Sequence, residues 1–320
     1  MHTLLDIRET SSVMMRDAYC ETLRDCAREG LDVVALDADL ISSSGMKPFF
    51  KEFPDRAVQC GIAEANMIGI AAGLSAVGKI PFAHSFGCFA SRRACDQIMI
   101  SAAYARLNVR IVGSDPGITA TYNGGTHMPF EDMGVLRSIP EITLIEPADP
   151  VAVRDVVRRL TRVYGVYYIR LARKNVKSIY ADGSTFEIGR GALLRQGGDV
   201  TVVASGVMVA EALEAADILG AEGVGVSVVD MFTWKPIDDD LIAGCAAATG
   251  AIVTAENHNI CGGLGAAVAE SVVKSRPVPI EMVGVRDRFG QVGTEDYLRK
   301  EYGLTARDIV GAVRRAVARK

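Results

Sequence analysis

The sequence has few of the residues that form disulfides or bind metal ions. Its seven cysteines are odd in number, and none of them belongs to a C-x-x-C pair. Its four histidines are scattered along 320 residues. We therefore expect reduced thiols that mostly serve as small core residues, with neither a disulfide framework nor a zinc site.

Targeting segments, long apolar runs and basic tracts are also missing. The N-terminal stretch contains Asp6, Arg8 and Glu9 and lacks the apolar run of a signal peptide. No uncharged run approaches the length of a membrane span. The net charge is -4, and no basic tract interleaves with aromatic residues. The sequence therefore predicts a cytoplasmic protein that binds neither membranes nor nucleic acid.

Aromatic residues make up only 6% of a chain that is 49% hydrophobic. The core is therefore aliphatic, which suits layers of helices on parallel strands. Short apolar runs alternate with helical patterns, first up to about residue 171 and again from residue 200. The predicted strands are 31–36, 80–83, 109–112, 142–145, 166–171, 200–204, 225–229, 251–254 and 280–283. The predicted helices include 12–29, 62–77, 88–106, 150–163 and 264–274.

One carboxylate, Glu64, lies at the start of the otherwise apolar segment 61–74. Small and aliphatic residues on every face of this helix predict burial all round. Because a glutamate is rarely buried without a partner, Glu64 either complements the helix dipole or carries chemistry. Phe86 and Phe89 follow the next predicted strand. Two such rings could enclose a flat ligand, although packing in the core is the commoner use.

Three further segments contain candidate ligand-binding residues. Residues 113–129 form a long glycine-containing loop that ends in Thr126 and His127, and such loops are often functional. Arg16 and Arg173 could clamp a phosphate, although a solvated arginine is the default. Segment 256–265 is glycine-rich but lacks the G-x-G-x-x-G order, so we reject a nucleotide-phosphate site there.

Together, these motifs resemble the C-terminal half of transketolase over nearly the whole chain. The resemblance rests on several segments that occur in the family's order. They are G-I-x-E-x-x-M at 61–67, G-G-T-H-M-P-F-E-D at 124–132, I-P-E-I-T-L-I-E-P-A-D at 139–149, R-L-A-R at 170–173, F-T-W-K-P-I-D at 232–238 and E-N-H-N-I-C-G-G-L-G at 256–265. An ordered set of this kind is far more specific than any one of its members.

The resemblance implies two α/β domains. Residues 1–178 would form a thiamine-diphosphate pyrimidine-binding domain with a parallel sheet. Residues 179–190 would form a linker, and residues 191–320 a transketolase C-terminal domain with a mixed sheet.

It also implies a thiamine-diphosphate enzyme that moves a two-carbon ketol unit from a ketose phosphate to an aldose phosphate. The family's G-D-G…N motif for the diphosphate is absent. We therefore expect one subunit of a split transketolase, in an α2β2 assembly with an N-terminal subunit. That partner would hold most of the diphosphate and its Mg²⁺ or Ca²⁺, and this chain would supply no metal ligand.

The resemblance assigns roles residue by residue. Glu64 would hydrogen-bond N1′ of the aminopyrimidine, and Phe86 and Phe89 would enclose that ring. His127 would act on substrate oxygens, and Asp39 falls where the family places an acid near the cofactor interface. The residues expected to hold the sugar phosphate are Arg16, Ser43 and Arg173.

Three positions depart from the family pattern. Arg92 stands where a third aromatic usually completes the pyrimidine wall. Asp115, in Ser114-Asp115-Pro116, lies in the segment where the family has a histidine. Asn123 replaces an acid that reads a substrate hydroxyl. Because these changes alter charge and proton donation near the substrate, we expect an unusual or branched sugar.

Two alternatives stay open at this point. The β subunit of a 2-oxoacid dehydrogenase has similar length and also supplies an activating glutamate, but the G-G-T-H-M-P segment and the candidate phosphate arginines favour transketolase. A non-catalytic subunit that retains the fold is the other, and an idle carboxylate at Glu64 would be costly in that case.

Overall fold

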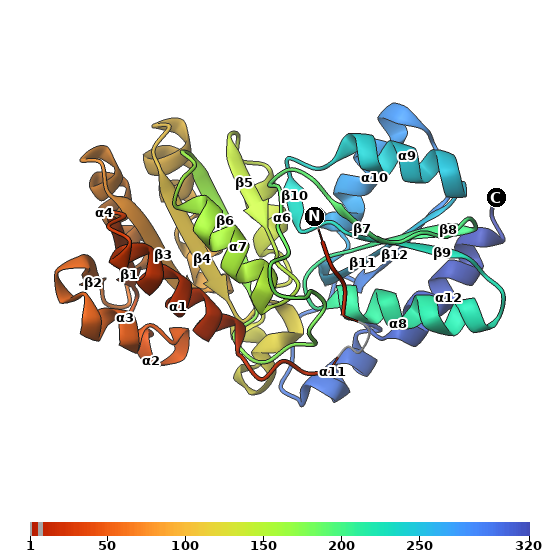
Figure 1. Cartoon of the computed structure of the whole chain (residues 1–320), viewed down its shortest axis with the longest axis horizontal. Coiled ribbons are helices and arrows are strands. Elements are labelled where there is room, and N and C mark those ends of the chain that lie inside the picture. Colours follow the sequence, from red (N-terminus) through yellow and green to blue (C-terminus); the bar gives the residue numbers. More distant parts are fainter. Residues whose placement is uncertain (1, 6–8) are drawn as a thin grey trace.

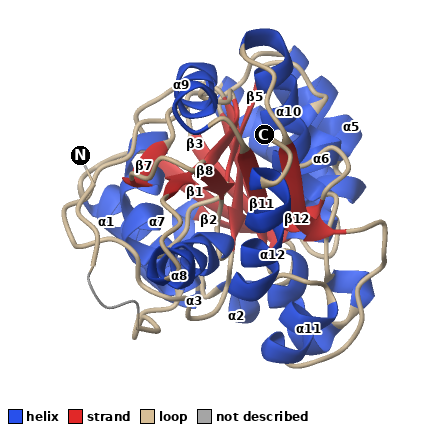
Figure 2. Ribbon diagram, turned by 90° about the vertical axis from the view of Figure 1, so that its right-hand side faces the viewer, coloured by secondary structure: helices blue, strands red, loops and turns tan. Residues whose placement is uncertain are grey.

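A computed structural model describes residues 2–5 and 9–320 of the chain. Met1 and residues 6–8, which include Asp6 and Arg8 of the N-terminal stretch, lie outside the described residues. Two β-sheets stand side by side, and helices cover both faces of each (Figures 1 and 2). The predicted alternation of strands and helices therefore produces the expected α/β layers.

The first sheet has seven strands in the order β10-β5-β6-β4-β3-β1-β2. All neighbours are parallel except β10, which runs antiparallel to β5. The strands are β1 Val33–Asp37, β2 Ala57–Gln59, β3 Ile80–Phe86, β4 Val109–Ser114, β5 Ile142–Ile145, β6 Val166–Leu171 and β10 Thr233–Lys235. The helices in this half are α1 Met15–Arg28, α2 Ile41–Ser44, α3 Lys47–Glu52, α4 Glu64–Ala76, α5 Cys95–Gln97, α6 Asp132–Arg137 and α7 Pro150–Leu160.

The second sheet has five strands in the order β12-β11-β8-β9-β7 and is mixed, because β7 runs antiparallel to β9. Its strands are β7 Ala192–Arg195, β8 Val200–Ala204, β9 Val226–Asp230, β11 Ile252–Asn259 and β12 Ile280–Val285. The helices are α8 Met208–Ala221, α9 Asp239–Thr249, α10 Leu264–Ser275, α11 Glu295–Glu301 and α12 Ala306–Val317. A mostly parallel first sheet and a mixed second sheet agree with the predicted fold class.

Several elements differ from the sequence prediction. The region predicted as one helix over 88–106 contains two stretches of wide π-type turns, Phe89–Arg93 and Ile98–Tyr104, on either side of α5. Such turns have a longer repeat than the 3.6-residue pattern on which the prediction rested. Strand β3 continues to Phe86, three residues past its predicted end, so Phe86 closes the strand instead of following it. The short strands β2, β7 and β10 were not predicted.

The apolar core has two parts, one on each side of the paired sheets. One part lies beneath α1, α7, α8 and α12, and the other beneath α4, α6, α9 and α10. Each part contains residues from both sheets, so the two halves of the chain share their core. Among the described residues, no helix is both long enough and apolar enough to cross a membrane.

A buried arginine on β6, Arg170, joins the two halves through its hydrogen bonds. Its guanidinium donates to Asp132 at 3.0 Å, to Glu146 at 2.7 Å, and to the backbone oxygens of Pro129 and Asn257 at 3.1 and 2.9 Å. Asp132 begins α6, whereas Asn257 lies on β11 of the second sheet. The arginine and both carboxylates are almost completely buried, so the pairing compensates charges that have lost their hydration.

We expect Arg170→Met to lower the free energy of unfolding by about 3 kcal/mol or more, because two buried carboxylates lose their cation. Urea unfolding followed by circular dichroism would measure the change. The matched control is Arg314→Met on the exposed face of α12, where the pair with Glu222 contributes less than about 1 kcal/mol. An equal decrease in the free energy of unfolding in both variants would show that the buried pairing stabilises the fold no more than an exposed pair does.

A second prediction concerns Asp230 at the end of β9. This fully buried carboxyl accepts a hydrogen bond from the Tyr180 hydroxyl at 2.6 Å, and loss of solvent raises its pKa to about 8. Because an unfolded aspartate titrates near pH 4, the folded state holds the proton more tightly, and this contribution to stability is lost as pH rises through 8. Asp230→Asn has no proton to lose, so its stability relative to the parent should improve by about 1 kcal/mol between pH 7 and pH 9. Parallel pH dependences of unfolding would contradict the assignment.

Candidate functional site

Glu64 is the first residue of α4, and its carboxylate is buried, with 3% of the residue exposed. The carboxylate accepts a hydrogen bond from the Ser85 hydroxyl at 3.1 Å and pairs with the Arg93 guanidinium at 3.3 Å. Ser85 comes from β3, which lies next to β1 in the sheet. The helix cap residue is Ala63, so the Glu64 side chain does not serve as the cap.

Three rings pack together next to Arg93, the cationic partner of this carboxylate. The centroids of Phe86 and Phe89 are 6.1 Å apart, and the His127 ring meets both of them edge-on at 5.6 and 5.1 Å. The Arg93 guanidinium lies 3.8 Å from the centroid of Phe89. Burial and the charge of Arg93 lower the pKa of His127, so its imidazole is neutral at pH 7. A hollow of about 480 Å³ opens against Phe89, Arg93 and His127.

A group of basic residues continues the site from Phe86. Arg173 follows the end of β6, and its guanidinium lies 5.5 Å from the Phe86 centroid. Its Nε is 3.1 Å from Oδ1 of Asp115, a completely buried carboxylate. Loss of solvent raises the pKa of Asp115 to about 6, and Arg173, Lys174 and Arg16 limit that rise. The structure thus brings together the predicted residues Arg16, Asp115 and Arg173 next to the aromatic wall.

The loop that carries Asp115 is held by the second domain. Asn257 on β11 accepts a hydrogen bond from the Ile118 N–H at 3.0 Å and donates to the Pro116 oxygen at 3.0 Å. Gly117 has a φ of +50°, and a Cβ there would lie 2.2 Å from the Asn257 amide oxygen. Only glycine therefore fits at this contact. The glycine-rich segment at 256–265 contributes to positioning this loop through Asn257.

Arg16 contacts Ser43, but through the backbone of Ser43 and not through its side chain. Arg16 lies on α1 and donates from Nη1 to the backbone oxygen of Ser43 at 2.9 Å. Ser43 belongs to α2, the short helix that follows β1. This contact places the hydroxyl-bearing turn of α2 against the guanidinium.

Three other predicted residues lie at the surface. Asp39 is exposed, with a φ of 66°, and its backbone N–H donates to Gln59. Asn123 is exposed at the end of a helical turn. Arg92 is half exposed and pairs with Glu131 at 2.9 Å on the wall of the hollow. Within residues 2–5 and 9–320, no hydrogen bond or ion pair joins the side chains of these three to Glu64 or Asp115.

Sequence reasoning missed three residues of this site. Ser85 and Arg93 are the partners of Glu64, and Lys174 donates to Thr121 Oγ1 at 2.9 Å beside the Asp115 loop. Arg93 stands four residues after Phe89, a spacing that on any helical turn suggests a contact between the two. The pairing of Arg93 with Glu64 depends on how α4 packs, which no local signal reveals.

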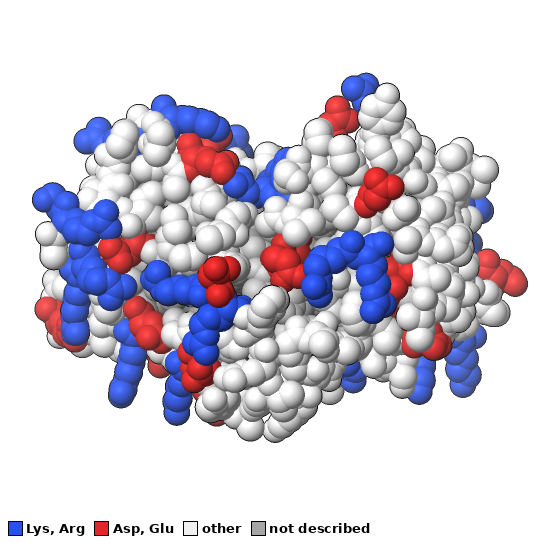
Figure 3. All heavy atoms as spheres, turned by 180° about the vertical axis from the view of Figure 1, so that it is seen from behind, with Lys and Arg blue, Asp and Glu red and all other residues white. Residues whose placement is uncertain are grey.

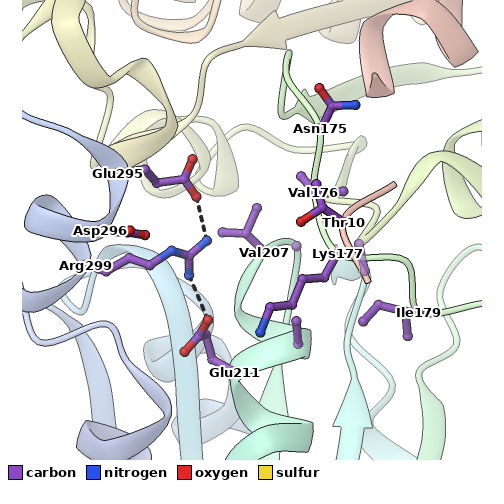
Figure 4. A pocket seen from close by; sticks show the side chains of 13 residues that line it. Thr10, Asn175, Val176, Lys177, Ile179, Val207, Glu211, Glu295, Asp296 and Arg299 are labelled. Carbon is purple, nitrogen blue, oxygen red and sulfur yellow. Dashed lines mark hydrogen bonds and ion pairs between the residues drawn. The ribbon is translucent and has the colours of Figure 1, made fainter. Parts of the chain in front are cut away.

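A second cavity, of about 320 Å³, lies where residues 175–179 meet α8 and α11 (Figure 4). Figure 4 shows Arg299 reaching toward Glu211 and Glu295, with contacts of 3.2 and 2.6 Å. None of the predicted site residues lines it. Because its lining comes from both halves of the chain and Arg299 is held by two of its carboxylates, we describe the cavity as a joint between the two halves.

The charges elsewhere are mixed. On the face turned to the viewer in Figure 3, basic and acidic side chains lie interspersed. In the described part of the chain, no three His, Cys, Asp or Glu residues are grouped so that they could hold a metal ion.

Comparison with known families decides the relationship. Residues 11–178 match the family described as "Transketolase, pyrimidine binding domain", and residues 189–309 match "Transketolase, C-terminal domain". The chain belongs to the transketolase family. It is 50% identical over 306 residues to the "6-deoxy-6-sulfo-D-fructose transketolase subunit SqwH" of Clostridium sp., a match that covers 96% of this chain and 95% of that protein.

Other transketolases show the same division. One of the subunits of the apulose-4-phosphate transketolase of Phocaeicola vulgatus is 34% identical, over 91% of this chain and 94% of that one. Human transketolase is 34% identical over 98% of this chain, which spans 51% of that longer protein. A solved structure described as "Split gene transketolase, inactive beta4 tetramer" matches with a TM-score of 0.91 and 45% identity, covering 97% of this chain and all of that one. These matches confirm the predicted resemblance to the C-terminal half of transketolase.

Proposed function

We propose that this chain is the C-terminal (β) subunit of a split transketolase. It works with an N-terminal subunit, as α2β2, to transfer a two-carbon ketol unit from a ketose to an aldose. The observation that carries the proposal is the buried Glu64 carboxylate, whose half-exposed cationic partner Arg93 packs on a cluster of three rings. A buried carboxylate whose planar N–H donor lines a hollow is poised to bind a planar nitrogen heterocycle.

The residues present fit the aminopyrimidine of thiamine diphosphate. Arg93 lies flat against Phe89 and donates N–H to Glu64, so its guanidinium occupies the position of a planar N–H donor. In the loaded enzyme, Glu64 would hold the proton at N1′, and Phe86 and Phe89 would enclose the ring. When bound, the cofactor supplies the electron sink for cleaving a carbon–carbon bond next to a carbonyl. We assign most of the diphosphate and its Mg²⁺ or Ca²⁺ to the partner subunit, with Asp39 near the shared interface.

The other residues of this chain would bind and orient the sugar. The neutral imidazole of His127 can donate to or accept from a substrate oxygen. Arg173 and Arg16 would hold the anionic end of the sugar through charge-assisted hydrogen bonds, with Ser43 beside them. Asn123 would face a substrate hydroxyl, and Arg92 would stay at the edge of the cofactor site.

The two split relatives carry the names of unusual sugars, 6-deoxy-6-sulfo-D-fructose and apulose 4-phosphate. Asp115 and Asn123 also replace the histidine and the acid expected of ordinary pentose-phosphate enzymes. We therefore propose a ketose with a modified anionic end as donor and an aldose phosphate as acceptor. A sulfonated hexoketose is the first donor to test.

We expect Glu64→Gln to lower the turnover of the reconstituted complex at least 100-fold, because an amide cannot hold the ring proton in the same way. The rate of aldose consumption, measured with an excess of cofactor, reports the effect. Glu141→Gln, which changes an exposed carboxylate paired with Arg106, is the control and should stay near the parent rate. Full activity of Glu64→Gln would instead favour a non-catalytic subunit.

Arg93 leads to a prediction about cofactor affinity. Because the aminopyrimidine must displace Arg93 from Glu64, Arg93→Met should tighten thiamine-diphosphate binding several-fold, as a competing contact is lost. Calorimetric titration of the complex in the presence of magnesium measures this. Arg314→Met is the matched control, since Arg314 pairs with Glu222 on the exposed face of α12 and should leave the affinity unchanged. Weaker binding by Arg93→Met would mean that Arg93 holds the cofactor.

A further inference from the structure

Asp115 is a buried negative charge set among the basic residues that face the sugar's anionic end. It is 0% exposed, and its ion pair with Arg173 joins Oδ1 to Nε at 3.1 Å. Neither carboxylate oxygen accepts a well-aligned hydrogen bond from the described residues. This carboxylate therefore has spare acceptor capacity and a charge that is only partly satisfied.

The neighbouring charges define the local balance. Arg173, Lys174 and Arg16 are the three cations that lower the pKa of Asp115. The only other carboxylate paired with one of them among the described residues is the exposed Asp17, 3.7 Å from Arg16. His84 on β3 is also buried. Burial and the charge of Arg173 lower the pKa of His84 to about 3, so this imidazole contributes no charge at neutral pH. Asp115 is thus the buried carboxylate that lowers the positive electrostatic potential of this site.

The repulsion between Asp115 and a bound anion discriminates between anions of different charge. An anionic head group that binds Arg173 must also lie close to Asp115, because Asp115 contacts the same guanidinium. In a desolvated site the repulsion grows with each negative charge on the ligand. A phosphate monoester carries about -1.5 to -2 at pH 7. A sulfonate carries a single negative charge and is repelled less.

We propose that Asp115 is a specificity-determining residue, which shifts this site's preference from a dianionic phosphate toward a monoanionic sulfonate on the end of the sugar. This inference rests on the proposed transketolase function. The positive φ of Asp115, 58°, and the grip of Asn257 on the adjoining residues Pro116 and Ile118 fix where the carboxylate stands. The discrimination is therefore built into the loop and does not need a conformational change.

The test compares two donors that differ in their end group, 6-deoxy-6-sulfo-D-fructose and D-fructose 6-phosphate, with one acceptor and the reconstituted complex. The readout is the ratio of kcat/KM for the sulfonate to kcat/KM for the phosphate. Asp115→Asn keeps the shape of the side chain and removes its charge, so the ratio should fall about tenfold. Asp17→Asn is the control, because Asp17 is an exposed carboxylate 3.7 Å from Arg16 Nε, and its ratio should stay within about twofold of the parent.

A second variant, in which a positive charge is removed, keeps the test valid if Asp115→Asn fails to fold. Lys174→Gln removes a positive charge near the same carboxylate, so the ratio should rise. An unchanged ratio in Asp115→Asn, or a fall in Lys174→Gln, would overturn the inference.

A binding measurement separates this inference from the proposed function. The complex is titrated with methyl phosphate and with methanesulfonate, which need no turnover. Asp115→Asn should strengthen methyl phosphate binding about tenfold relative to methanesulfonate. If the complex transfers no ketol unit from either donor, the proposed function fails, whereas the titration still decides the role of Asp115. Equal changes for both probes would refute the charge selection.

Discussion

The arrangement of the site depends on one buried cation, the Arg170 guanidinium. A charge at this depth is tolerable only when every donor has a partner, and Arg170 finds its partners in two carboxylates and two backbone oxygens. Those partners come from the end of the site loop, from the start of α6, from the residue after β5 and from β11. The arginine therefore fixes where three segments of the chain meet its own strand β6, and the position of the site loop follows from that meeting point.

The second domain acts as part of the scaffold of the site. Asn257 grips the loop after β4, and the Phe130 ring packs against Tyr302 with centroids 5.2 Å apart. A Cβ at Gly125 would lie 2.3 Å from the Gly290 oxygen, so the backbones of the two halves approach closely there. The second domain thus supports the loop that carries Asp115 and His127 at several points, which suits the proposed role of these residues in holding a charged ligand in one geometry.

The sequence predicted the features that have a local signature. Apolar runs alternating with helical patterns indicated the α/β class, and the order of motifs placed Glu64, the two phenylalanines and His127 in one protein family. The contact of Asp115 with Arg173 could not be predicted, because it joins residues that follow two neighbouring strands and lie far apart in the chain. The length of β3 and the π-type turns after it also could not be predicted. A short apolar stretch with small residues has no periodicity that distinguishes a strand end from a helical turn. The partners of Glu64 required the packing of α4 against β3.

Strand β10 restricts the movement of the two halves of the chain relative to each other. It belongs to the second half of the chain by sequence, yet it forms the edge of the first sheet beside β5. Moving the halves apart would break backbone hydrogen bonds as well as side-chain packing, so the chain has no soft hinge between its two family domains. It should therefore unfold as one cooperative unit, and in the proposed enzyme a sugar would enter without a movement of one half against the other.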